Sequence, residues 1–335
     1  MNYQWFIDPK RNDKLSKLNK LELNELLSEL DSFYLTYRKN LGLPETVSFG
    51  IELEYQNMSN ELTKQYLENN VSTWNFVEEK TLDKGGEINS PIMFDEIKYW
   101  KELRQVCNYL KQNNADVDMG ASTHVHVGVQ VLGSCVDNWR KFIKTYIVYE
   151  SILSRFFYGD KINPRITLMD YAYPIADILY TEIENLNKIE NIEELQYIVP
   201  RRQFQAVDFR KIRFYDADSI RNLNTLEFRS PNGTKEEIIC QNNINTITKL
   251  LLSPSKNMID EEYLDYRLNN ERISSTTNYS LYSDINLDLA LELVDMIFDN
   301  NLDKIYFLRQ YIKDNRISSD CNDTIHSKKF IKGGI

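Results

Sequence analysis

Four short segments of this chain alternate polar and apolar residues, and this pattern constrains the fold more than any other feature of the sequence. In residues 120–129, "GASTHVHVGV", His124 and His126 fall on one face of a β-strand and the valines on the other, because side chains alternate along a strand. Such a strand packs a core with one face and presents polar side chains with the other. We therefore expect a sheet with one buried face and one functional face.

The other three segments place charged residues in the same way. In "FGIELEY", Glu52 and Glu54 share a face opposite apolar residues, and in "GGEINSPI" Glu87 follows a glycine pair. In "NTLEFRSPNGT", Glu227 and Arg229 share a face, and turn residues close the segment. Taken singly, each pattern is also typical of a solvated strand face or a surface salt bridge. Together, the four segments predict one shared site.

Helices are predicted on either side of these strands. Apolar residues recur at helical spacing in four segments, residues 14–33, 94–113, 137–157 and 235–252. Residues 197–234 are interpreted as strand-like, and the last residues, 318–335, as a mobile polar tail. Helices and strands mix without strict alternation, which predicts an α+β fold on a mainly antiparallel sheet.

Three regions are expected along the chain. We interpret residues 1–44 as an N-terminal helical extension, 45–254 as the catalytic core, and 255–335 as a C-terminal helical region with the tail. Neither a repeat nor a Gly, Ser or Pro-rich linker separates them.

Composition narrows the class of protein. A formal net charge of −10 argues against nucleic acid and membrane surfaces as partners, because both bind basic patches. The sequence has no apolar run of membrane-spanning length, and its first residues do not resemble a signal peptide, so we expect a cytoplasmic protein. The four cysteines are scattered, which predicts neither disulfides nor a thiolate metal site.

The residue types in the four strands favour a particular chemistry. Carboxylates with imidazole and without thiolate suit hard divalent cations such as Mg²⁺ or Mn²⁺, which commonly bind phosphates. A neighbouring arginine suits phosphoryl oxygens. Because the sequence has neither a P-loop nor a G-x-G-x-x-G fingerprint, metal ions and side chains would have to hold those phosphates.

In order, spacing and residue type, the four segments resemble the amidoligase family, a branch of the glutamine synthetase and glutamate-cysteine ligase superfamily of carboxylate-amine ligases. The resemblance spans about residues 49–252. It implies a curved antiparallel sheet whose concave face binds ATP with Mg²⁺ or Mn²⁺. It also implies that ATP phosphorylates a substrate carboxylate and that an amine then attacks the acyl phosphate to form an amide.

The resemblance assigns roles to individual residues. The implied metal ligands are Glu52, Glu54, Glu87, His124 and Glu227. The residues implied to contact nucleotide are His126 and Arg229. Apart from the resemblance, the basic residues Arg201, Arg202 and Arg213 could reach phosphate or a substrate carboxylate, and of these we favour Arg213. Arg229, Glu227 and Glu87 would take part in catalysis, with Arg229 at the transferred phosphoryl group.

One position departs from the family pattern. Family members often carry an Asp-Ser step after a Trp strand, whereas this chain reads "WNFVEEKTL", so that Glu78 or Glu79 would replace the Asp.

Two other functions stay open. A hydrolase could bind Zn²⁺ through His124, His126 and a carboxylate, or a relative could bind a nucleotide or peptide without turnover. The expected partners are small-molecule or peptide acids and amines, which the sequence does not identify, and an oligomer is possible.

Overall fold

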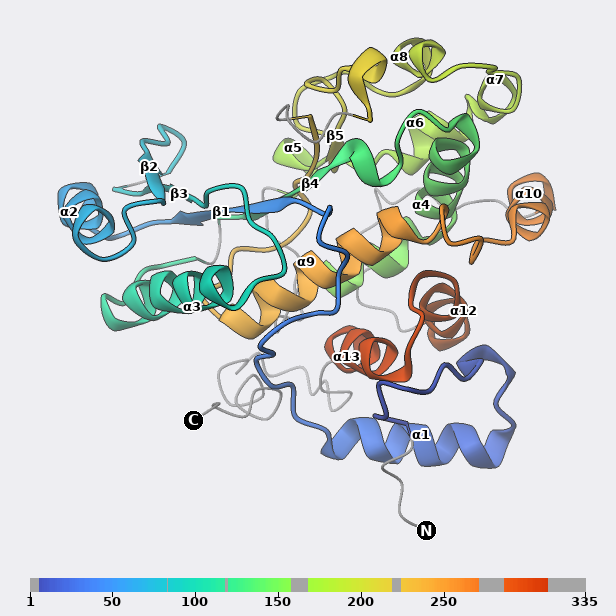
Figure 1. The fold of residues 1–335 in the computed structure, drawn as a ribbon, viewed down its shortest axis with the longest axis horizontal. Helices are drawn as coiled ribbons and strands as arrows, with labels where there is room; N and C mark the ends of the chain where they lie inside the picture. The colour runs from blue at the N-terminus through green and yellow to red at the C-terminus, as the bar shows by residue number, and fades with distance from the viewer. Residues whose placement is uncertain are drawn as a thin grey trace.

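A single antiparallel sheet lies at the centre of the fold (Figure 1). The computed structural model describes residues 6–82, 84–117, 120–157, 168–218, 224–270 and 286–312. In this part of the chain the sheet has six strands in the order β2-β3-β1-β4-β6-β5, and all neighbouring strands are antiparallel. The strands are β1 (Phe49–Tyr55), β2 (Asn75–Val77), β3 (Gly86–Asn89), β4 (Thr123–Gly128), β5 (Val207–Asp208) and β6 (Thr225–Phe228). The predicted α+β class with a mainly antiparallel sheet is confirmed.

Helices cover the apolar face of this sheet. The long helices nearest to it are α3 (Ile97–Gln112), α4 (Val136–Phe157) and α9 (Glu237–Leu252) (Figure 1). Trp100 of α3 stacks on Phe49 of β1 with ring centroids 5.3 Å apart, and Phe142 of α4 contacts Phe228 of β6 at 6.4 Å. Burying these rings removes large apolar areas from water, which stabilises the packing of helix on sheet. The charged residues of the same strands point to the other face.

The N-terminal and C-terminal segments pack together on the far side of α9. Their helices are α1 (Lys20–Ser32), α12 (Leu287–Ile297) and α13 (Asn301–Ile312), and α1 lies against α13 (Figure 1). Buried side chains from Phe6 to Ile312 belong to one hydrophobic core that includes the sheet. The three regions expected from the sequence, with boundaries after residues 44 and 254, stay a prediction.

Shorter elements complete the described structure. The helices are α2 (Asn60–Asn70), α5 (Leu168–Tyr171), α6 (Ala176–Tyr180), α7 (Ile183–Leu186), α8 (Leu195–Ile198) and α10 (Glu261–Asn270). The 3₁₀ turns are η2 (Leu15–Lys17), η3 (Val129–Val131), η4 (Ile192–Glu194) and η5 (Phe214–Asp216).

The first helix begins later than the leucine spacing predicts. Asn19 caps α1, because its side chain accepts hydrogen bonds from the backbone of Leu21 and Glu22 while Glu22 accepts from the backbone of Asn19. Leu15 therefore lies in the separate turn η2. Leu21 is 69% exposed, whereas Leu30 is buried, so only part of the leucine stripe faces the core.

The strand-like interpretation of residues 197–234 is mostly wrong. The described residues there form only the two short strands β5 and β6, besides the end of α8 and the turn η5. Strand β5 ends at Asp208, whose carboxylate accepts a hydrogen bond from the Arg210 backbone and turns the chain. Continued alternation after the histidines predicts Gln130 on their face of the sheet, and this prediction is wrong, because the strand ends at Gly128 and Gln130 lies in η3.

Two further expectations concern the chain ends and membranes. The predicted mobile tail at residues 318–335 lies outside the described residues. Among the helices that the structure describes, none combines the length and apolarity needed to cross a membrane.

Candidate active site

The strand register brings the predicted charged residues together on one face of the sheet. Residues directly opposite each other on neighbouring strands have side chains on the same face and only about 5 Å between their Cβ atoms. The register pairs Glu52 with His124, Glu54 with Glu87, and His126 with Glu227. These six residues, the carboxylate–imidazole cluster, come from the central strands β3, β1, β4 and β6.

Glu52 is the centre of this cluster. Its Oε2 lies 2.8 Å from Nδ1 of His124, and its Oε1 lies 2.9 Å from Nε2 of His126. The other ring nitrogen of His126 lies 3.3 Å from the Thr225 hydroxyl, which fixes the ring plane. Nδ1 of His124 is also 3.5 Å from Glu227, so one imidazole is shared by two carboxylates. The two histidines therefore act as a pair held by one glutamate.

Ser122, two residues before His124, holds Glu54 with its backbone and its side chain. Oε2 of Glu54 accepts hydrogen bonds from the Ser122 backbone at 2.6 Å and the Ser122 hydroxyl at 2.5 Å. The same hydroxyl lies 2.8 Å from Nε2 of His124, and the other oxygen of Glu54 lies 3.6 Å from that nitrogen. Ser122 thus orients Glu54 and His124 toward each other, a role that the sequence did not predict.

Burial and mutual charge shift the ionisation of the cluster. Burial alone would raise the pKa of Glu52, but hydrogen bonds from His124 and His126 outweigh it and hold that pKa well below its usual range. Burial would lower the pKa of His126, but the hydrogen bond and negative charge of Glu52 outweigh it and raise that pKa. Burial, together with the negative charge of Glu52, raises the pKa of Glu87 to about 7. Glu52 is therefore compensated by the two imidazoles, whereas Glu87 is not.

The same atoms are close enough to hold a cation. Ligand atoms of Glu52, His124 and Glu227 all lie within 4.8 Å of one another, and so do those of Glu54, Glu87 and His124. Three carboxylate or imidazole donors around one point, without sulfur, suit Mg²⁺ or Mn²⁺ better than softer metals.

An orphaned oxygen beside the cluster also fits a bound cation. Asn89 lies opposite Glu52 on the same face, and its buried Oδ1 has no hydrogen-bond partner among the described residues. A buried acceptor without a donor is unfavourable unless water or an ion satisfies it.

Arg229 is bound on several sides. Its Nη1 pairs with Glu227, its Nε donates to the carbonyl of Tyr171 at 3.1 Å, and its guanidinium lies 6.0 Å from the ring centroid of Phe204. The side chain therefore has a fixed orientation beside the cluster, which suits contact with an anion that binds there.

A second carboxylate–guanidinium pair lies next to Glu227. Asp208 of β5 is opposite Glu227 on β6 and is buried. Burial would raise the pKa of Asp208, but Arg210, whose Nη2 lies 2.6 Å from Oδ2, lowers it. Lys211 is 71% exposed and reaches within 3.9 Å of Glu227. Sequence reasoning missed Asp208 and Arg210, although the alternation in "AVDF" contains a weak signal.

The remaining predicted residues lie outside the cluster's contacts. The side chain of Arg213 is exposed, and among the described residues no hydrogen bond or ion pair joins it to the cluster. Its backbone exchanges hydrogen bonds with Asn224, directly before β6. Glu79 accepts hydrogen bonds from the backbone and hydroxyl of Thr81, and Glu78 is exposed. Whether either glutamate replaces the family Asp stays a prediction.

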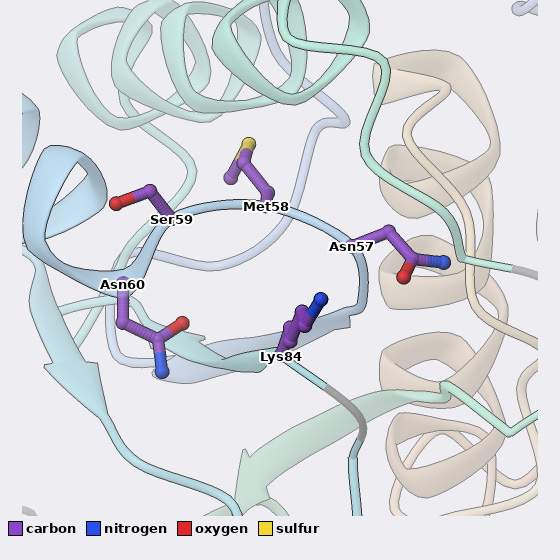
Figure 2. A pocket seen from close by; sticks show the side chains of 5 residues that line it. All are labelled: Asn57, Met58, Ser59, Asn60 and Lys84. Carbon is purple, nitrogen blue, oxygen red and sulfur yellow. The ribbon is translucent and has the colours of Figure 1, made fainter.

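A separate cavity lies beyond the end of β1 (Figure 2). It has a volume of about 580 Å³ and is lined by Asn57, Met58, Ser59, Asn60 and Lys84. Asn60 donates to the carbonyl of Gly85, which ties the loop after β1 to the start of β3. None of the lining residues belongs to the carboxylate–imidazole cluster, so this cavity is distinct from it.

Comparison with known families decides the classification. Residues 73–251, just over half of the 335 residues, match the model of a family described as "Putative amidoligase enzyme". The chain belongs to the amidoligase family. The matched residues contain β3, β4 and β6 with their cluster residues, whereas β1 with Glu52 and Glu54 precedes them. Among curated proteins, none matches this sequence. The predicted membership of the amidoligase family is confirmed over these residues.

Proposed function

We propose that this amidoligase-family protein is an ATP-dependent carboxylate-amine ligase that uses Mg²⁺ or Mn²⁺ on a glutamine synthetase-like sheet. The proposal rests mainly on the convergence of Glu52, His124 and Glu227, whose ligand atoms lie within 4.8 Å of one another beside an oriented arginine. Neighbouring carboxylates without a cation would repel a triphosphate. A cation bound by these residues would neutralise them and give the phosphates a partner.

In this proposal, the γ-phosphoryl group of ATP is transferred to an oxygen of the substrate carboxylate, and ADP leaves. The amine nitrogen then attacks the acyl carbon, the bond from that carbon to the phosphate oxygen breaks, and phosphate leaves with the electron pair. The amine loses a proton as the amide forms. Divalent cations, when bound, would screen the phosphate charges in both steps.

In this proposal, each residue of the cluster has a task. Glu52, Glu54, Glu87, His124 and Glu227 would hold the cations, and His126 would lie near the nucleotide phosphates. Arg229 would donate to the phosphoryl group in flight, an interaction stronger in the transition state than in the ground state. Arg213 remains a candidate for nucleotide contact, although its exposed side chain would have to turn toward the cluster to make that contact.

A zinc-dependent hydrolase is the main alternative. The pair His124 and His126 favours it, but Glu52 engages both rings and the donor set is dominated by carboxylates. Metal analysis of protein purified without added metal separates the two functions. Stoichiometric, tightly held zinc would support the hydrolase, and its absence together with Mg²⁺-dependent nucleotide binding would support the ligase.

The deciding activity test is a phosphate-release screen with Mg²⁺ and ATP over pairs of small-molecule or peptide acids and amines. We expect release that requires both the acid and the amine, with the amide detected by mass spectrometry. Glu227→Gln, which removes one charge from the cluster, should abolish the signal. Phosphate release that needs neither substrate, or that persists in Glu227→Gln, would argue against the ligase. A nucleotide-binding protein without turnover would bind ATP and give no amide with any pair.

A further inference from the structure

Phe204 has an unusual backbone conformation close to the cluster. Its φ angle is +68°, in the left-handed region that is unfavourable for side chains with a Cβ. The other non-glycine residues with positive φ in the described chain are three asparagines and a lysine, and asparagine tolerates this region. A bulky aromatic residue keeps such a conformation only when the surrounding structure enforces it, and such residues gather at functional sites.

The backbone around Phe204 forms a short ladder that ends at Arg229. The carbonyl of Phe204 accepts from the backbone of Tyr173 at 2.7 Å, and the carbonyl of Tyr173 accepts from Ala206 at 2.7 Å. The carbonyl of Ala206 in turn accepts from the backbone of Arg229 at 2.9 Å. These bonds fix the chain on both sides of Phe204 and connect it to the end of β6.

The ring of Phe204 completes a cradle for the Arg229 side chain. Its centroid lies 5.0 Å from that of Tyr171 at an interplanar angle of 79°, an edge-to-face contact. The Arg229 guanidinium lies 6.0 Å from the Phe204 centroid, within cation–π range, and its Nε donates to the Tyr171 carbonyl. Tyr171, Phe204 and Glu227 therefore all contact the Arg229 side chain.

We propose that Phe204 is a positioning residue whose left-handed backbone places its ring where it aims Arg229 at the transferred phosphoryl group. This inference rests on the proposed ligase function. A strand-end arginine without such support could take several rotamers, and small displacements of a catalytic donor lower transition-state stabilisation strongly. The strain at Phe204 is then the structural requirement for a fixed guanidinium.

Three substitutions separate aiming from folding. Phe204→Ala removes the ring and keeps the unfavourable φ, Phe204→Gly removes the ring and relieves the φ, and Phe204→Tyr keeps the ring. The glycine variant should melt at a higher temperature than the alanine variant, because glycine adopts positive φ freely. If Phe204 only supports the fold, function should follow this order of stability. If it aims Arg229, the alanine and glycine variants should be equally impaired.

The functional readout compares two probes by calorimetry, Mg²⁺–ATP and Mg²⁺–ADP with aluminium fluoride, which mimics the phosphoryl group in flight. We expect both ring-deleted variants to bind the fluoride complex about 10-fold more weakly while their ATP affinity changes less than about 3-fold. Phe204→Tyr should retain the wild-type ratio. Wild-type ratios in the alanine and glycine variants, or recovery in glycine alone, would overturn the inference.

A second readout does not depend on nucleotide. In protein labelled with ¹⁵N-arginine, the Nε–H signal of Arg229 should be identified by its loss in Arg229→Lys and protected from exchange by the bond to Tyr171. Faster exchange in the alanine and glycine variants supports aiming by Phe204, and unchanged exchange contradicts it. If the wild-type protein binds no Mg²⁺–ATP, the proposed function is wrong, and so is the proposed contact of Arg229 with a phosphoryl group. The exchange of the Arg229 Nε–H signal still decides whether Phe204 orients Arg229.

Discussion

Two groups of buried carboxylates in this protein differ in how their negative charge is compensated. Between α9 and α13, Asp303 lies 2.6 Å from Arg38 and 3.6 Å from Lys249, and it also accepts a hydrogen bond from Asn245. On the polar face of the sheet, the carboxylates of the cluster face one another and two imidazoles. The helical group contains its own positively charged side chains, whereas the positive charge beside the sheet group comes mainly from Arg229.

The partly exposed Asp299 and the cluster's Glu87 show the same contrast in their pKa values, although the pKa of Glu52 is lowered by its two histidines. Burial would raise the pKa of Asp299, but its bonds to Lys256 and Lys249 outweigh this and lower the pKa below its usual range. Burial and Glu52 instead raise the pKa of Glu87 to about 7. Where carboxylates serve the fold, as at Asp303 and Asp299, the chain supplies the opposite charge. Where it does not, the missing charge is expected from a bound cation.

The largest expected effect separates the two groups by stability. Asp303→Asn should lower the free energy of unfolding by about 3–5 kcal/mol, because it leaves the buried Arg38 without its carboxylate, while Lys249 keeps only Asp299. Glu87→Gln, the matched control in the cluster, should change it by less than about 1 kcal/mol in chelator, since it relieves repulsion. Urea unfolding of both variants measures this. Equal destabilisation by both changes would remove the distinction.

Arg229→Lys should affect turnover rather than binding. Lysine keeps the charge but loses the planar fork of donors, so amide formation should slow by about 10²-fold while ATP affinity stays near wild type. Arg11 forms an exposed ion pair with Asp13, so Arg11→Lys serves as the control and should leave turnover unchanged. Near-normal turnover in a folded Arg229→Lys protein would take Arg229 off the catalytic list.

Mg²⁺ should stabilise the wild-type protein and not a cluster variant. At ten times its Kd, a cation that binds only the folded state adds about 1.4 kcal/mol to the free energy of unfolding. Thermal melts with and without Mg²⁺ should therefore differ for the wild type, and Glu52→Gln should lose most of the difference. A Glu52→Gln protein that gains as much from Mg²⁺ would place the cation elsewhere.

The smallest effect concerns acid. Because the pKa of Asp299 is lowered in the folded state, its stabilisation is present above its unfolded pKa and is lost as pH falls through the folded pKa. The side chain is 38% exposed, so solvent screening keeps the contribution below about 1 kcal/mol. Asp299→Asn should be slightly less stable than wild type at pH 7 and equal to it in strong acid. A difference that persists in acid would assign the effect to packing.

The sequence predicted the sheet and most of the cluster because strand alternation is a local property. "FGIELEY" and "THVHVG" each contain enough residues to define two faces, and Glu52, His124 and Glu227 then follow from pairing the strands. Helices α3, α4 and α9 were equally visible as apolar stripes.

Other parts of the site depend on contacts that no local pattern encodes. Strand β5 has only two residues, so alternation gives only a weak signal for Asp208, and its partner Arg210 lies in the following turn. Ser122 and Phe204 act through tertiary bonds and a backbone angle that the side-chain types do not predict. The prediction of strands over residues 197–234 was mostly wrong for the same reason. Outside β5 and β6, the described residues there lie mainly in turns and loops, which strand alternation does not encode.

Calorimetric titration with ATP in Mg²⁺ and in chelator, on the wild type and Glu52→Gln, tests the central claim that the cluster binds nucleotide through a cation. We expect wild-type binding in Mg²⁺, at least about 10-fold weaker binding in chelator, and no gain from Mg²⁺ in Glu52→Gln. Equal ATP affinity of the wild type with and without chelator would contradict the account.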